Sequence, residues 1–173
     1  MSHSIDLAKL TLQDALDIAL IIEEEASERY SELARQLELH HTDEAAAFFR
    51  RMVGYEKAHA AQLREKRQQL VGDAPSEVDP VEVPELEAPD FGAIRAFMSP
   101  HAALRVAMQS EVRAHEFYSK ALESVKDEQV RELFAEMVEE EAHHKMLVQQ
   151  QMDKLPPEDT QDPDANVDPP VAH

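Results

Sequence analysis

The sequence uses one short pattern, Glu-x-x-His, at two places 85 residues apart. Residues 52–63 read MVGYEKAHAAQL, and residues 137–148 read MVEEEAHHKMLV. At this offset the acids and the imidazoles coincide, Glu56 with Glu141 and His59 with His144. Residues three apart lie on one face of an α-helix, so each carboxylate and imidazole can reach one point. Two such pairs in matching apolar frames predict a metal site with internal symmetry.

A second pattern, a Glu followed seven residues later by a Tyr, also occurs twice. Residues 22–30 read IEEEASERY, and residues 110–118 read SEVRAHEFY. At an offset of 88 residues these stretches align Glu23 with Glu111 and Tyr30 with Tyr118. The chain therefore contains two halves of one helical pattern. Four Glu and two His match the ligand set of a di-iron carboxylate centre inside a four-helix bundle.

Composition narrows the fold class and the kind of site. Only 3 of 173 residues are Gly, which favours helices over hairpins, and the absence of Cys excludes disulfides and thiolate metal sites. The net charge of −19 argues against nucleic-acid binding. No cationic start precedes an apolar run, and no apolar run approaches the roughly 18 residues of a membrane span. We therefore expect neither a signal peptide nor a membrane contact, and a cytoplasmic location.

Apolar periodicity and capping residues predict an all-α fold with four helices. We expect them over about residues 12–39, 43–71, 100–124 and 128–154. The expected helix-start signals are Thr11 with Asp14, then Thr42, Ser99 before Pro100, and Asp127.

The segment between the second and third helices, residues 72–98, is acidic and contains prolines spread through its length. The prolines exclude a continuous helix. About 27 extended residues can span up to roughly 90 Å, more than the roughly 40 Å length of each long helix. We therefore predict a ferritin-like antiparallel four-helix bundle over residues 1–154, with one long crossover between helices two and three. We expect Phe91, Ile94 and Phe97 to pin a short helical piece onto the bundle, and residues 155–173 to form a disordered acidic tail.

Taken together, the motifs EEEASERY, YEKAH, SEVRAHEFY and EEEAHH resemble those of the rubrerythrin-like branch of the ferritin-like superfamily, over roughly residues 12–154. The resemblance implies a non-haem di-iron site with three kinds of ligand. These are terminal Glu23 and Glu111, bridging Glu56 and Glu141, and one imidazole for each iron from His59 and His144. Tyr30 and Tyr118 would each hydrogen-bond a ligand carboxylate across the pseudo-twofold axis.

The chain differs from its nearest family patterns in three ways. It has no Cys for the rubredoxin domain of rubrerythrin proper. Ala114 stands where rubrerythrin carries an additional carboxylate, one turn after Glu111. Lys57 stands where bacterioferritin has its haem-binding Met, so we expect no haem.

Several other histidines could approach the site. The fourth helix offers a second register, Glu140 with His143, but the alignment with the second helix favours Glu141 with His144. We interpret His143 and His115 as flanking or surface residues. We interpret His40 and His41 as turn and helix-end residues.

These patterns lead us to expect a di-iron oxidoreductase that reacts Fe(II) with peroxide or oxygen, as a ferroxidase or a peroxide scavenger. Two alternatives are open: a component that stores or handles iron, and a structural bundle that holds Zn or Mn without redox chemistry. O2 or H2O2 would be the small-molecule substrate, and the sequence does not identify the electron donor or the native metal. Family analogy favours a homodimer.

Overall fold

The computed structural model describes residues 6–39, 42–80, 83 and 99–157. A short 3-10 helix, Leu7–Lys9, precedes four long helices. These are α1 (Leu12–Leu39), α2 (Asp43–Leu70), α3 (Pro100–Ser124) and α4 (Glu128–Lys154). The all-α four-helix bundle predicted from the sequence is confirmed, and no strand occurs among the residues described.

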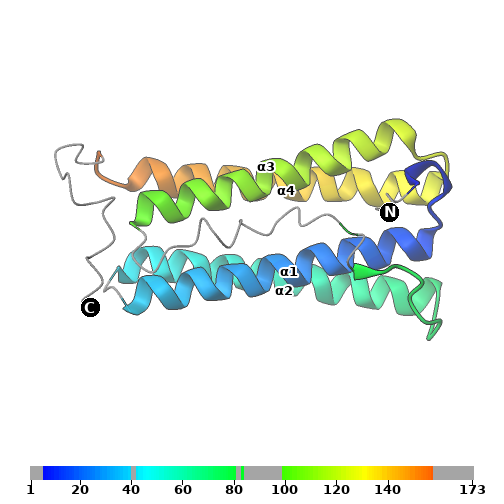
Figure 1. Ribbon diagram of the computed structural model, residues 1–173, viewed down its shortest axis with the longest axis horizontal. Helices are drawn as coiled ribbons and strands as arrows, with labels where there is room; N and C mark the ends of the chain where they lie inside the picture. The colour runs from blue at the N-terminus through cyan, green and yellow to red at the C-terminus, as the bar shows by residue number, and fades with distance from the viewer. Residues whose placement is uncertain (1–5, 40–41, 81–82, 84–98, 158–173) are drawn as a thin grey trace, which may run out of the picture.

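The helices pack as two antiparallel pairs, α1 with α2 and α3 with α4, and α1 also touches α4. In Figure 1, α2 and α3 run in the same direction, which agrees with the long crossover predicted from the sequence. The docking predicted for Phe91, Ile94 and Phe97 lies outside the described residues, as do His40, His41 and residues 158–173 of the predicted tail. Within the described helices, no stretch is both long enough and apolar enough to cross a membrane.

Three of the four predicted helix starts are capped as the sequence indicates. Thr11 and Asp14 form a reciprocal capping box, in which each side chain accepts a hydrogen bond from the backbone N–H of the other. The Ser99 hydroxyl accepts from Ala102 N at 3.1 Å, and the Asp127 carboxylate accepts from Val130 N at 3.1 Å.

Thr42 does not cap α2 with its side chain, contrary to the prediction. Its hydroxyl donates a hydrogen bond to the Leu37 carbonyl oxygen at 2.7 Å and so satisfies the end of α1 instead. The backbone explains the difference, because Thr42 has ψ 61°, whereas the capping Ser99 has ψ 155°. An N-cap side chain normally reaches the first-turn N–H groups from the extended region.

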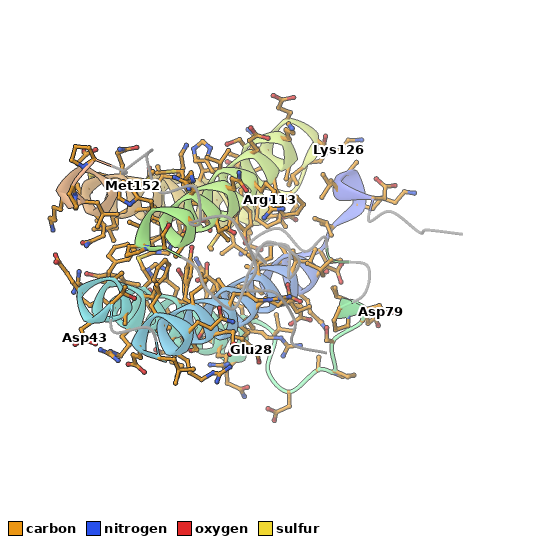
Figure 2. All side chains as sticks on the ribbon, turned by 60° about the vertical axis from the view of Figure 1, so that its left-hand side comes forward. Glu28, Asp43, Asp79, Arg113, Lys126 and Met152 are labelled. Carbon is orange, nitrogen blue, oxygen red and sulfur yellow. The ribbon has the colours of Figure 1, made fainter. Side chains whose placement is uncertain are left out.

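The apolar core forms two clusters that lie at opposite ends of the bundle. One joins the first half of α1 to the end of α3 and the start of α4, with Leu16, Tyr118 and Phe134. The other joins the second half of α1 to the first halves of α2 and α3, with Leu33 and Phe49. Side chains fill the space between the helix pairs (Figure 2). The two clusters meet near the middle of α1, where the polar residues described next are buried.

The start of the crossover is tied to the bundle by Arg67. Its guanidinium pairs with Asp17 at 2.5 Å and donates hydrogen bonds to the carbonyl oxygens of Gly72 and Ala74. Gly72 has φ 72°, a left-handed conformation that ends α2 at little steric cost. These contacts turn the chain back toward the α1 side as it leaves α2.

Candidate metal centre

The predicted ligands come from all four helices and gather in the buried middle of the bundle. The helices contribute Glu23 from α1, Glu56 and His59 from α2, Glu111 from α3, and Glu141 and His144 from α4. The four carboxylates and His144 are no more than 1% exposed, whereas His59 is partly exposed. Burying four carboxylates together is costly unless cations or protons compensate their charge.

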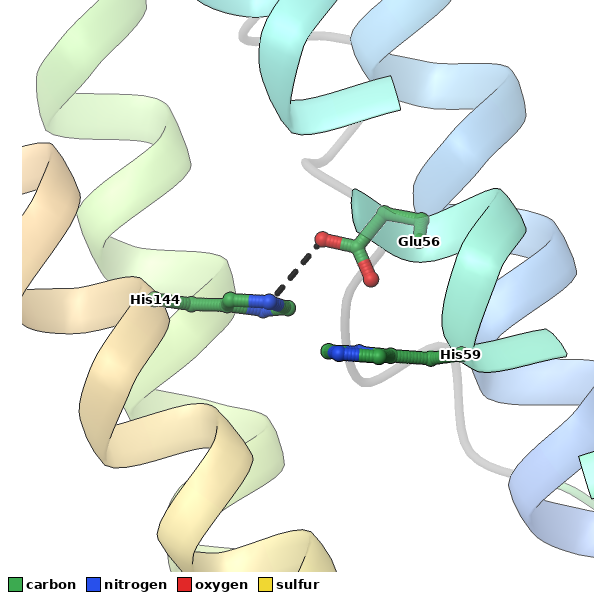
Figure 3. A group of neighbouring side chains, drawn as sticks. All are labelled: Glu56, His59 and His144. Atoms are coloured by element: carbon green, nitrogen blue, oxygen red, sulfur yellow. Dashed lines mark ion pairs between the residues drawn. The ribbon is translucent and has the colours of Figure 1, made fainter. Parts of the chain in front are cut away.

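His144 lies among carboxylates from two other helices. Its Nδ1 is 3.3 Å from Glu56 Oε1 and 3.5 Å from Glu111 Oε2. Figure 3 shows Glu56 and His59 facing His144 across the space between α2 and α4. One nitrogen of this imidazole therefore points to the place where a bound cation would meet both carboxylates.

His59 occupies the matching position on α2. Its Nδ1 is 3.6 Å from Glu23 Oε2, and its ring stacks on the His144 ring with centroids 5.2 Å apart and planes 11° apart. His59 thus approaches Glu23 of its own half of the repeat, and His144 approaches Glu111 of its own half as well as Glu56.

Ligand-type atoms come close enough to share an ion in two groups of three residues. One group is Glu56, His59 and His144, and the other is Glu111, Glu141 and His144, with the atoms of each group within 4.8 Å of one another. Glu23 falls outside both groups, although its carboxylate approaches His59. Geometry thus brings five of the six predicted residues into ion-sized clusters, and ligation by all six stays a prediction.

The four buried carboxylates and the two imidazoles form a layer across the middle of the bundle, and its electrostatics favour the binding of cations. Both oxygens of Glu23 and of Glu56 are buried without a hydrogen-bond partner among the described residues. Burial raises the pKa of Glu56 well above its usual range, and the neighbouring charges of Glu23 and Glu111 raise this pKa further. Contact with the Glu23 carboxylate raises the pKa of His59. Carboxylate oxygens with imidazole nitrogens suit iron, manganese or zinc, so the residues fit a pair of such ions.

The two predicted tyrosines differ in their surroundings. The Tyr30 hydroxyl donates a hydrogen bond to Glu111 Oε1, which links α1 to α3 across the bundle. Tyr118 is equally buried and packs on Phe117 and Phe134. In the described part of the chain no hydrogen bond joins Tyr118 to Glu23, so the symmetric role of Tyr118 stays a prediction.

Among the flanking residues, Glu140 of the less favoured register approaches a candidate ligand, whereas the two flanking histidines do not form the clusters described above. His143 is exposed, and His115 is partly exposed, with a pKa that its partial burial lowers. Glu140, by contrast, places its Oε2 3.2 Å from His59 Nε2. The repeat gave no signal for this contact, because it joins one half of the chain to the other.

Comparisons with known proteins agree with this arrangement. A family model described as rubrerythrin matches residues 14–94 and 102–171. The structure is similar to a crystal structure of an uncharacterized conserved protein from Magnetospirillum magnetotacticum MS-1. The TM-score is 0.72 and the sequence identity 30%, over 85% of this chain and 97% of that chain. No curated protein matches the chain.

Proposed function

The chain belongs to the rubrerythrin family, and we propose that its buried carboxylate layer holds two iron ions for a redox reaction with hydrogen peroxide or oxygen. The observation that carries the proposal is the burial of four carboxylates beside two imidazoles, between two apolar clusters. A structural role alone does not require four acids to be buried together, because apolar residues would fill the same space at lower cost.

Charge balance supports two divalent ions in this layer. Four carboxylates and two neutral imidazoles carry the charge that two Fe(II) ions neutralise. Glu23 with His59 and Glu111 with His144 would each hold one ion. Glu56 and Glu141 would supply the remaining carboxylates that hold the pair.

The residues around the site would exclude water from it and orient one of its carboxylates. A bound iron pair would supply the two electrons that reduce hydrogen peroxide to two water molecules, with two protons taken up. The apolar clusters on both sides exclude water, which strengthens every charge interaction within the layer. The Tyr30 hydroxyl holds the Glu111 carboxylate in place through its hydrogen bond.

Anaerobic loading with Fe(II), followed by measured additions of H2O2 or O2, tests the proposal. We expect about two iron ions per chain. We also expect oxidation to Fe(III), with one H2O2 consumed for every two Fe(II). Glu56→Ala should abolish this reaction, whereas Glu139→Gln, at an exposed position on α4, should leave it unchanged.

Other outcomes of the same experiment would favour other functions. Iron uptake that continues well beyond two ions per chain would point to storage or iron handling. Tightly held zinc, with no oxidation of added Fe(II), would contradict the proposal and favour a structural bundle.

A further inference from the structure

The two copies of the repeat differ at a position that lies beside the histidines. At the 85-residue offset that aligns His59 with His144, Glu140 aligns with Tyr55. Each of these residues lies next to the histidine of the other half. Glu140 Oε2 is 3.2 Å from His59 Nε2, whereas the Tyr55 ring is 6.4 Å from the His144 ring. A carboxylate therefore flanks one imidazole, and an aromatic ring flanks the other.

This difference concerns the surroundings of the Nε2 atom of each histidine. Both histidines turn Nδ1 toward a carboxylate of the buried layer, Glu23 for His59 and Glu56 for His144. The Nε2 of His59 faces Glu140, whereas the Nε2 of His144 is buried without a hydrogen-bond partner in the described part of the chain. When the ring nitrogen that does not bind the metal donates its N–H to a carboxylate, the ring orientation is fixed and the ligating nitrogen becomes more basic.

The side of the site that carries His59 and Glu140 is also nearer to solvent than the side that carries His144. The side chain of His59 is 16% exposed and that of Glu140 is 44% exposed, while His144 is 1% exposed. An ion arriving from solvent would therefore meet Glu140 and His59 before it reached the carboxylates buried behind them.

We propose that Glu140 is a positioning residue that makes the two metal positions unequal. It holds His59 with Nε2–H outward and Nδ1 free to ligate, so the position of Glu23 and His59 binds a divalent ion first and more tightly. Among the described residues no carboxylate supports His144 in this way, so the position of Glu111 and His144 fills second. This inference rests on the metal pair proposed above, and it adds an order of loading that the repeated ligands alone do not imply.

Titration of the metal-free protein with Zn²⁺ tests the order, with calorimetry for affinity and with ¹⁵N spectra of labelled histidines for position. In the wild type we expect two separate binding steps, and the first equivalent should shift the ring nitrogens of His59 before those of His144. Before zinc is added, the spectra should show the proton of His59 on Nε2.

Variants at the α4 surface isolate the role of Glu140. Glu140→Gln should weaken the first step by about 10–100-fold and leave the second step unchanged. Glu140→Ala should in addition remove the preference of His59 for a proton on Nε2. Glu139→Gln removes the same charge from the neighbouring exposed position and should change neither step. Since Glu140 is partly exposed, these variants should fold, and circular dichroism checks this.

The possible failures separate this inference from the proposed function. Two equal steps in the wild type, or equal weakening of both steps by Glu140→Gln, would overturn the role of Glu140 and leave the metal pair intact. The same loss in Glu139→Gln would reduce the effect to general surface charge and would also overturn it. Failure of the wild type to bind two ions would overturn both proposals.

Discussion

Replacing Glu56 with Gln should stabilise the metal-free protein while weakening its affinity for metal. Glu56 is 1% exposed, and neither of its oxygens has a hydrogen-bond partner among the described residues. Burial and the charges of Glu23 and Glu111 raise its pKa well above the usual range, so its ionised form opposes folding. Gln has nearly the same shape and carries no charge, and it therefore removes this opposition.

The size of the effect follows from the cost of burying a charged group without partners, because Gln is as polar as Glu but carries no charge. Relief of that cost is worth about 1–3 kcal/mol in the free energy of unfolding. In a chain of this length each kcal/mol shifts the Tm by roughly 2–4 °C, so we expect Tm to rise by about 2–12 °C at neutral pH.

The stabilisation of the metal-free protein by Glu56→Gln should depend on pH. The folded-state pKa of Glu56 lies above its unfolded value, so the folded chain holds the proton more tightly. The penalty in the wild type is absent below the unfolded pKa, near 4.5 for this carboxyl, and it grows as pH rises through the folded pKa. The advantage of Glu56→Gln should therefore be small in acid and increase toward alkaline pH.

Urea and thermal unfolding of metal-stripped proteins over a series of pH values would measure this advantage. Glu139→Gln serves as the control, because it removes a carboxylate that is already in water. Saturating metal should reverse the order of stability, because ions stabilise the form that binds them. The reasoning would be refuted if Glu56→Gln were less stable than the wild type, or if its advantage did not change with pH.

Three further predictions concern contacts near the site and the crossover. Tyr30→Phe removes the donor to Glu111 and should lower the free energy of unfolding by about 0.5–1.5 kcal/mol, measured by urea denaturation. Arg67→Ala leaves the buried Asp17 carboxylate without its cation and should lower the free energy of unfolding by about 1.5–3 kcal/mol. The double variant Asp17→Asn/Arg67→Ala should lose less stability than the sum of the losses in the two single variants. Affinity for divalent ions should fall as pH is lowered, because protons compete for Glu56, and calorimetry at several pH values would show this.

The helices could be predicted from the sequence because their signals are local. Capping pairs such as Thr11 with Asp14 lie within one turn, and the apolar periodicity of each helix does not depend on its neighbours. Thr42 shows the limit of such signals. Whether it caps α2 depends on its backbone angle, and with ψ at 61° its hydroxyl reaches the Leu37 carbonyl oxygen instead.

The candidate ligands were also predictable, because the duplication compares each helix with its counterpart in the other half. The contact of Glu140 with His59 was not, because it crosses between the halves and depends on how α2 and α4 are set against each other. Three contacts between α2 and α4 give their relative orientation: Glu56 with His144, His59 with Glu140, and Lys66 with Glu136. As residue numbers rise along α2 they fall along α4, so the helices are antiparallel and the residue that follows Glu56 by one turn meets the residue that precedes His144 by one turn. A repeated sequence can therefore specify matching candidate ligands, while the residues that meet across the antiparallel pair give the two histidines different neighbours.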